Sequence, residues 1–206
     1  FLKNFFKKIN IEINRNDFYK SKRFDHGDWF THKVPLFMNY FQNKNEINEI
    51  LEVGSWEGRS ACFFLNYFKN CNITCVDTWK GSPENFNNTK TNLSIVEKNF
   101  DYNILEYKSR VTKIKSTSKN FFSNNIKKFD LIYIDGSHIY EDVLNDANES
   151  FKILKDKSYI LFDDYDWVFH KKGKNPINAI NQFLKSNRDK IQTIYISSQV
   201  LVKKIK

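Results

Sequence analysis

Three aspartates in two short motifs have the chemistry of a metal site: Asp135 stands in D-G-S-H, and Asp163 and Asp164 stand in F-D-D-Y. Each motif directly follows an apolar run that is typical of a buried strand. Carboxylates at neighbouring strand ends repel one another strongly unless a cation lies among them. A hard cation such as Mg²⁺ prefers several oxygen ligands and keeps water molecules that a substrate can displace. Capping of a following helix is the alternative role for any single one of these aspartates.

A glycine turn provides a second candidate site. The segment 51–60 reads L-E-V-G-S-W-E-G-R-S. Gly54 allows a tight turn after a strand, and Gly58 allows close approach of the backbone to a ligand. The spacing differs from the dinucleotide motif G-x-G-x-x-G, from the phosphate loop and from the nucleophile elbow G-x-S-x-G. A plain strand-to-helix turn without a ligand is the alternative.

The elements that would position both motifs alternate between strands and helices. Apolar runs predict seven strands, and apolar residues at helical spacing predict the helices. The predicted strands are 47–53, 72–76, 111–115, 129–134, 158–162, 191–196 and 199–203, and the predicted helices are 34–41, 59–68, 93–102, 119–126, 140–154 and 178–185. This order indicates the α/β class, with a doubly wound, mostly parallel seven-stranded sheet, an antiparallel C-terminal strand and helices on both faces.

Ligands of such sheets bind beyond the carboxyl ends of the parallel strands. The acidic and glycine residues of this chain fall at those ends, namely Glu52 and Gly54, then Asp77, then Asp135, then Asp163 and Asp164. The sequence therefore predicts one pocket along a single edge of the sheet.

The first motif, acidic-x-G-x-x-x-G, resembles the first motif of class I methyltransferases, which have a Rossmann-like fold and use S-adenosylmethionine (SAM). A carboxylate such as Glu52 suits the positive charges of SAM, whereas it would repel a pyrophosphate. Asp77 resembles the ribose clamp of this family, although dinucleotide-binding folds use the same device. The resemblance implies that the cofactor contacts Glu52, Gly54, Ser55, Gly58, Ser60, Asp77, Thr117, Ser118 and Asp135.

The paired motifs D-L-I-Y-I-D-G-S-H and I-L-F-D-D-Y-D are similar to those of macrocin-type sugar O-methyltransferases and their catechol-type relatives, over residues 47–167. The resemblance implies that Asp135, Asp163 and Asp164 hold a divalent metal, usually Mg²⁺. His138 follows Asp135 by three positions, where catechol-type enzymes have a basic Lys. An imidazole there can take the proton of a metal-activated hydroxyl group, so we expect Asp135 and His138 to take part in catalysis. Capping or packing of the next helix is the alternative role of His138.

These motifs predict a SAM-dependent O-methyltransferase that acts on a hydroxyl group of a small molecule, with a sugar as the first choice through the resemblance alone. The basic charge leaves an RNA ribose 2′-O-methyltransferase, or another nucleic-acid methyltransferase, as an alternative. Methylation of base amino groups is disfavoured because residues 135–138 lack the Pro-Pro-aromatic loop of those enzymes. A non-catalytic binding subunit of the same fold and an NAD-dependent oxidoreductase are further alternatives.

The length of 206 residues suits one domain, and we expect a basic and aromatic cap segment over 1–45 and the methyltransferase domain over 46–206. The polar segment 78–92 reads as a loop or lid, and together with the cap it is expected to set the specificity.

The formal net charge of +9 favours anionic partners only weakly, because the lysines are scattered along the chain. The three cysteines match no usual zinc pattern, and no apolar run approaches the length of a membrane span. We therefore expect a cytoplasmic protein with a small-molecule substrate, neither nucleic acid nor membrane as its main partner, and leave a homodimer open.

Overall fold

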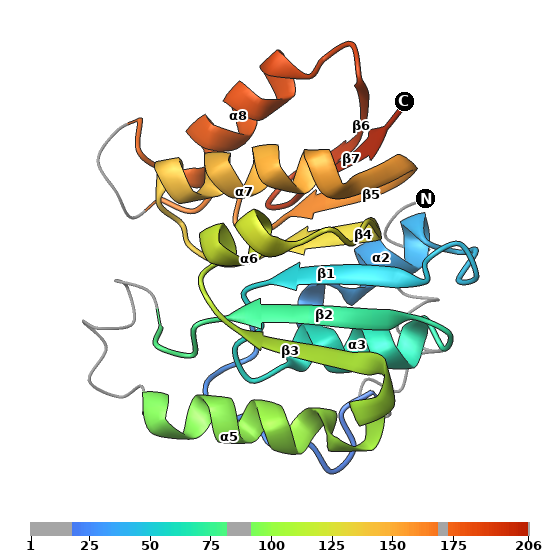
Figure 1. Cartoon of the computed structure of the whole chain (residues 1–206), viewed down its shortest axis with the longest axis vertical. Coiled ribbons are helices and arrows are strands. Elements are labelled where there is room, and N and C mark those ends of the chain that lie inside the picture. The colour runs from blue at the N-terminus through green and yellow to red at the C-terminus, as the bar shows by residue number, and fades with distance from the viewer. Residues whose placement is uncertain (1–17, 82–91, 169–172, 206) are drawn as a thin grey trace.

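The computed structural model of the chain describes residues 18–81, 92–168 and 173–205. Its centre is one seven-stranded sheet with the order β3-β2-β1-β4-β5-β7-β6 (Figure 1). The strands are β1 (Glu49–Val53), β2 (Asn72–Asp77), β3 (Val111–Lys115), β4 (Phe129–Ile134), β5 (Leu154–Phe162), β6 (Ile191–Ile196) and β7 (Val200–Lys204).

The strand directions confirm the predicted fold class. β3, β2, β1, β4 and β5 pair in parallel, whereas β7 runs antiparallel to both of its neighbours, β5 and β6. β5 begins at Leu154, four residues before its predicted start, where the prediction still continued a helix. Leu154 pairs with Phe129, and the register then shifts before Tyr159 pairs with Leu131. Residues 155–158 are polar, so the apolar pattern that predicts strands does not extend to this irregular beginning of β5.

Helices cover both faces of the sheet, as Figure 1 shows for α2 and α3 behind it and for α6 and α7 in front of it. The helices are η1 (Thr31–Lys33), α2 (Val34–Tyr40), α3 (Arg59–Tyr67), α5 (Leu93–Ile104), η2 (Leu105–Arg110), α6 (Ser118–Asn124), α7 (Tyr140–Ile153) and α8 (Pro176–Ser186). Among the described residues, no helix has the length and apolar character needed to cross a membrane.

Alternating side chains of the strands divide the core into two layers. Ile50 points to a layer formed with α2, α3 and α5, whereas its neighbour Leu51 points to a layer formed with α6, α7 and α8. Each strand of the centre is therefore apolar on both sides, as expected of a parallel sheet that helices cover on both faces.

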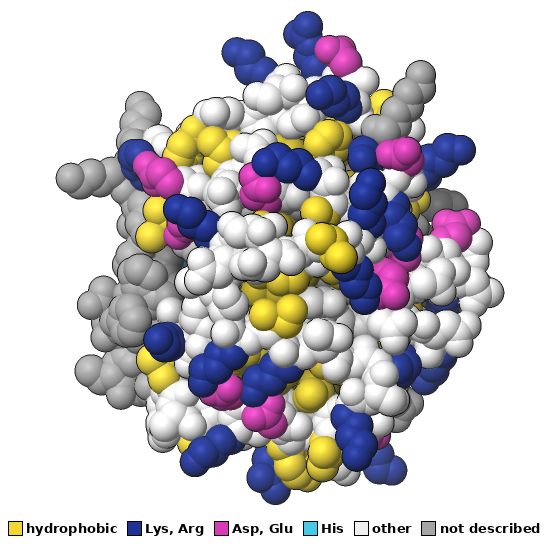
Figure 2. Space-filling view, in the orientation of Figure 1, with side chains coloured by type: hydrophobic (Ala, Val, Ile, Leu, Met, Phe, Trp, Pro, Cys, Tyr) yellow, Lys and Arg dark blue, Asp and Glu magenta, His cyan; other side chains and the backbone are white. Residues whose placement is uncertain are grey.

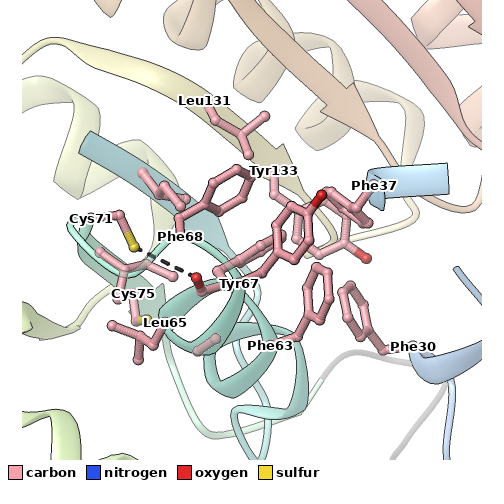
Figure 3. Close-up of a cluster of buried hydrophobic side chains, with 14 of the residues drawn as sticks. Phe30, Phe37, Phe63, Leu65, Tyr67, Phe68, Cys71, Cys75, Leu131 and Tyr133 are labelled. Carbon is pink, nitrogen blue, oxygen red and sulfur yellow. Dashed lines mark hydrogen bonds between the residues drawn. The ribbon is translucent and has the colours of Figure 1, made fainter. Parts of the chain in front are cut away.

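The N-terminal segment is part of the first layer. Phe30 and Phe37 lie in contact with Phe63 of α3 and near Tyr133 of β4, with ring centroids 5.5 to 6.1 Å apart (Figure 3). The predicted boundary between a cap and a domain at residue 45 stays a prediction, but the described residues from Phe30 onward share the core of the sheet.

Gly54 lets β1 turn against the end of β4. Its φ angle is +88°, and a Cβ atom on this residue would lie 2.0 Å from the carbonyl oxygen of Asp135. Gly58 has a φ of +78° at the beginning of α3, and a Cβ there would lie 2.9 Å from the ring of Phe100. The structure thus gives Gly58 a packing role, and its approach to a ligand stays a prediction.

Gly54→Ala is expected to lower the free energy of unfolding by at least about 4 kcal/mol, because a backbone atom blocks the new methyl group. Gly173→Ala is the matched control, since Gly173 has a φ of +85° but no atom within 4 Å of the position of a Cβ. It should lose only the roughly 1–2 kcal/mol of a left-handed residue. Urea unfolding of both variants measures the difference, and equal losses would contradict the close approach at Gly54.

Candidate active site

The predicted cofactor turn lies at the carboxyl end of β1 and is fastened to the end of β2. The Asp77 carboxylate accepts hydrogen bonds from the backbone N–H groups of Ser55 and Trp56, both at 2.8 Å, through the same oxygen. Its other oxygen accepts from Trp79 N at 2.6 Å. Gly54 N donates to Val76 O at 2.9 Å. Asp77, the predicted ribose clamp, therefore also fixes the shape of the turn.

Glu52 points from β1 toward α3 and is completely buried. Ser60, another predicted cofactor contact, donates its hydroxyl hydrogen bond to Glu52 Oε1. The second oxygen, Oε2, is buried and has no hydrogen-bond partner among the described residues. Burial raises the pKa of Glu52 to about 7, since the ionised form loses its water. A cationic group beside this carboxylate would stabilise its ionised form.

Thr117 and Ser118 occupy the turn between β3 and α6. Thr117 is the N-cap of α6, and its hydroxyl oxygen accepts a hydrogen bond from Asn120 N at 3.3 Å. Ser118 hydrogen-bonds to Asp146 of α7, whose pKa burial raises to about 6. Both hydroxyl groups therefore have partners within the protein, and their contact with an adenine ring stays a prediction.

The predicted metal ligands meet where β4 and β5 end side by side. Asp135 N donates to Val53 O at 2.8 Å, and Asp163 N donates to Ile134 O at 2.9 Å, so both residues directly continue the sheet. The hydroxyl group of Tyr133 lies within hydrogen-bond distance of both carboxylates, at 3.0 Å from Asp135 Oδ2 and closer to Asp163 Oδ2. The structure thus brings Asp135 and Asp163 together as the sequence predicts.

Asp135, Asp164 and His138 form a group of possible metal ligands, because one ligand atom from each lies within 4.8 Å of the others. His138 Nε2 lies 2.9 Å from Asp164 Oδ2. A small pocket is lined by these three residues together with Asp163, Gly136 and Ser137, among others. The predicted base therefore stands directly beside two of the three predicted metal ligands.

The alternative role of helix capping does not apply to these residues. α7 begins after Ile139 without a side-chain cap, and the next helix, α8, is capped by Asn175. His138 pairs with Asp164 instead, and its ring lies 5.4 Å from that of Trp167. The positive φ of Asp164, 51°, turns its side chain back toward His138.

Asp163 differs from its two neighbours in its partners. Its Oδ2 accepts from Tyr133 and from the ammonium group of Lys33, and its Oδ1 accepts from Asp164 N at 2.8 Å. Asp163 is consequently held by donors of the protein itself, and its direct contact with a metal stays a prediction.

The three carboxylates differ in their ionisation. Burial and the charge of Asp163 raise the pKa of Asp135 well above its ordinary value. Burial also raises the pKa of Asp163, although the ammonium group of Lys33 opposes this effect. Burial alone would raise the pKa of Asp164, but the hydrogen bond with His138 and the charge of Lys33 hold it below its ordinary value. A divalent cation would favour the ionised form of all three.

The sequence analysis missed Lys33 and Tyr133. Tyr133 precedes Asp135 by two positions. Because side chains two positions apart along a strand point to the same face, the sequence could have placed Tyr133 beside Asp135. No such signal exists for Lys33, because 130 residues separate it from Asp163.

A third missed residue is Glu57, whose carboxylate ties the N-terminal segment to the cofactor turn. It is buried and accepts hydrogen bonds from Asp25 N and His26 N at 3.2 Å and from Asn99 Nδ2 at 2.7 Å. It also pairs with His26 Nδ1 at 2.9 Å, and His26 Nε2 accepts from Asn92 N at 3.1 Å.

Residues 82–91 of the predicted lid lie outside the described part of the chain.

The buried Glu52 predicts a pH-dependent stability. A carboxyl group whose pKa rises on folding contributes stability that is complete below its unfolded pKa and is lost as pH rises through the folded value, here about 7. Glu52→Gln removes this titration, so the stability of the variant relative to the natural chain should rise by roughly 2 to 3 kcal/mol between pH 5 and pH 8. Urea unfolding at both pH values measures this difference, with exposed Glu46→Gln as the control. A difference that does not change with pH would contradict the burial of an ionisable Glu52.

Comparison with known proteins agrees with these motifs. Residues 51–165, more than half of the chain, match the family described as "Methyltransferase domain". Among curated proteins, 36 residues are 47% identical to the uncharacterized protein R132 of Acanthamoeba polyphaga mimivirus, which is 18% of this chain and 16% of that protein.

Solved structures share the fold at low sequence identity. A Staphylococcus aureus protein described as a caffeoyl-CoA O-methyltransferase has a TM-score of 0.61 and 14% identity, over 98% of this chain and 99% of its own. The MycE methyltransferase of the mycinamycin biosynthetic pathway, in complex with Mg and S-adenosylhomocysteine (SAH), has a TM-score of 0.62 and 16% identity, over 93% of this chain. The chain spans only 54% of the MycE chain. The family match confirms the predicted enzyme class: this chain belongs to the family of methyltransferase domains.

Proposed function

We propose that the chain transfers a methyl group from SAM to a hydroxyl oxygen of a small molecule, with a divalent cation at Asp135 and Asp164 and with His138 as the base. One observation carries this proposal. The ligand atoms of Asp135, His138 and Asp164 converge within 4.8 Å at the same edge of the sheet as the glycine turn.

The residues of the turn fit a cationic cofactor. Glu52 brings a buried carboxylate whose Oε2 has no hydrogen-bond partner among the described residues, and no lysine or arginine stands within the turn itself, residues 54–58. The turn has neither the glycine spacing nor the charge that a phosphate requires. These features support SAM over a dinucleotide.

The donor set of the acidic group fits Mg²⁺, which prefers carboxylate oxygens and keeps several waters. All three carboxylates, Asp135, Asp163 and Asp164, line the same small pocket, and one oxygen of Asp163 accepts hydrogen bonds from Lys33 and Tyr133. We therefore assign the ion first to Asp135 and Asp164, and Asp163 stays a predicted third ligand.

The chemistry then divides among the residues. When bound, SAM supplies the methyl group and the cation lowers the pKa of the acceptor hydroxyl group. His138 can receive the proton of the hydroxyl group, and Asp164, whose Oδ2 lies 2.9 Å from His138 Nε2, would stabilise the resulting imidazolium. Asp77 holds the turn that aligns the donor, so the main contribution of the fold is to align donor and acceptor.

The acceptor is proposed to be a sugar or a sugar-containing metabolite. Trp167 supports a ring-shaped acceptor, because its indole lies beside His138 and is 42% exposed. Nucleic acid receives little support as a partner, since acidic side chains lie among the Lys and Arg side chains over the face in Figure 2. A homodimer and a cytoplasmic location stay predictions.

Asp164→Asn tests the metal role with little change of shape, because Asn also tolerates the left-handed backbone of this position. The test measures transfer of a labelled methyl group from SAM to a panel of sugars, glycosides and catechols. We expect the natural chain to lose activity in EDTA, and Asp164→Asn to lose about 100-fold in the presence of Mg²⁺. Its affinity for SAH, measured by calorimetry, should change less than about threefold.

The control is Asp166→Asn, since Asp166 is exposed and lies two positions from Asp164. It should retain the activity of the natural chain. Full activity of the natural chain in EDTA would rule out the metal role, and a parallel loss of SAH binding in Asp164→Asn would show that Asp164 acts elsewhere.

A further inference from the structure

Asp164, a predicted metal ligand, has a backbone conformation that the surrounding structure must hold in place. Its φ angle is +51°, in the left-handed region where the Cβ atom of an ordinary residue is crowded. A residue persists in this region only where its surroundings determine its geometry. The Asp164 carboxylate then lies 2.9 Å from His138 Nε2. The contacts that hold the backbone of Asp164 therefore also decide where its carboxylate points.

Residues 164–167 form a turn that contacts His138 through its first and its last residue. Trp167 N donates to Asp164 O at 3.0 Å, and this hydrogen bond closes the turn. The carboxylate of Asp164 meets a ring nitrogen of His138, and the ring of Trp167 lies 5.4 Å from the imidazole with an angle of 31° between the ring planes. The position of this turn therefore fixes a predicted metal ligand and the predicted base together.

Tyr165 attaches the turn 164–167 to two neighbouring elements. Its backbone N–H donates to Ser198 O at 2.9 Å, in the hairpin turn between β6 and β7. Its hydroxyl group donates to Asn181 Oδ1 of α8 at 2.8 Å. Its ring is partly buried and packs against the core layer that α7 and α8 cover. Figure 1 shows α8 together with β6 and β7 at one end of the molecule, beyond β5 in the sheet.

The role of Tyr165 in the site is indirect. Among the described residues, Asp164 and His138 line the small pocket and Tyr165 does not. Tyr165 follows the left-handed residue directly, so its backbone, hydroxyl and ring contacts all limit how far the chain at Asp164 can relax. Without them, the backbone of Asp164 could return to an ordinary conformation and carry the carboxylate away from His138.

We propose that Tyr165 is a positioning residue of the active site: it attaches the turn 164–167 to the β6–β7 hairpin and to α8, and thereby keeps the carboxylate of Asp164 beside Asp135 and His138. This inference rests on the proposed function and leaves Asp163 as a predicted ligand. Ser198 and Asn181, the partners of Tyr165, lie outside the matched family region, 51–165. The C-terminal elements of the chain thus contribute to the geometry of the site.

The test measures Mg²⁺ binding and SAH binding by calorimetry in the natural chain and in Tyr165→Ala. This substitution removes the ring and the hydroxyl group, so the turn should relax and Mg²⁺ should bind about tenfold more weakly. The affinity for SAH should change less than about threefold, because the glycine turn belongs to other elements. In methyl transfer at saturating Mg²⁺, kcat should fall about tenfold while KM for SAM stays nearly unchanged.

Tyr140→Ala is the matched control. Tyr140 is also partly buried against the same core layer, and its hydroxyl group also donates to an amide side chain of α8, that of Gln182. Its loss should lower the free energy of unfolding by a similar amount and leave the Mg²⁺ affinity within about threefold of the natural chain. If Tyr140→Ala weakens Mg²⁺ binding as much as Tyr165→Ala does, the effect comes from loosening α8, and the proposal is rejected.

Two milder substitutions keep the proposal testable even if Tyr165→Ala does not fold. Tyr165→Phe and Asn181→Ala each remove one partner of the same hydrogen bond and leave the ring of residue 165 in place. Each should weaken Mg²⁺ binding about threefold, and the double variant should bind no more weakly than either single one, because the two groups act through one contact. Unchanged affinities, or losses that add, would then overturn the proposal.

The outcomes also separate this inference from the proposed function. If the natural chain binds Mg²⁺ and Tyr165→Ala binds it equally well, only the role of Tyr165 is overturned. If the natural chain binds SAH but no Mg²⁺, both the metal part of the proposed function and the role of Tyr165 are overturned.

Discussion

One electrostatic constraint dominates this structure: carboxylates that a parallel sheet brings to one buried edge need donors or cations beside them. β4 and β5 run side by side in parallel, so Asp135 and Asp163 leave the sheet as neighbours. Lys33 from η1 pairs with Asp163, and His138 from the loop before α7 pairs with Asp164, the next residue. The packing of these elements at the edge of the sheet therefore builds the core and also brings partners to the buried carboxylates.

The N-terminal segment connects the cofactor turn with the acidic group. His26 pairs with Glu57 in the cofactor turn. Lys33, only seven residues after His26, pairs with Asp163 at the end of β5. Between them in the chain, Phe30 is buried in the core. Movement of this short segment would disturb the glycine turn and the acidic group together. A segment that the family match does not include is thus built into the geometry of the site.

The sequence predicted the sheet and the positions of its acidic residues because both depend on local patterns. Apolar runs mark strands, and a carboxylate directly after such a run must lie at the carboxyl edge of the sheet. Lys33 and Glu57 escaped prediction because their partners, Asp163 and Asn99, are distant in the chain. Asp163 illustrates the same limit: its position follows from the strand, but whether it faces a lysine or an ion depends on packing that no local pattern encodes.

Glu52 and Asp163 compensate for burial in different ways. Glu52 has the hydroxyl group of Ser60 and no cation as a hydrogen-bond partner, so its pKa rises to about 7 and it can exchange a proton near neutrality. Asp163 has a permanent ammonium partner in Lys33. A cationic donor that approaches Glu52 would therefore release a proton on binding, by linkage. At the acidic group, a divalent cation would favour the ionised forms of Asp135 and Asp164. In the proposed reaction, the cationic methyl donor and the metal-bound oxygen would therefore meet at one edge of the sheet.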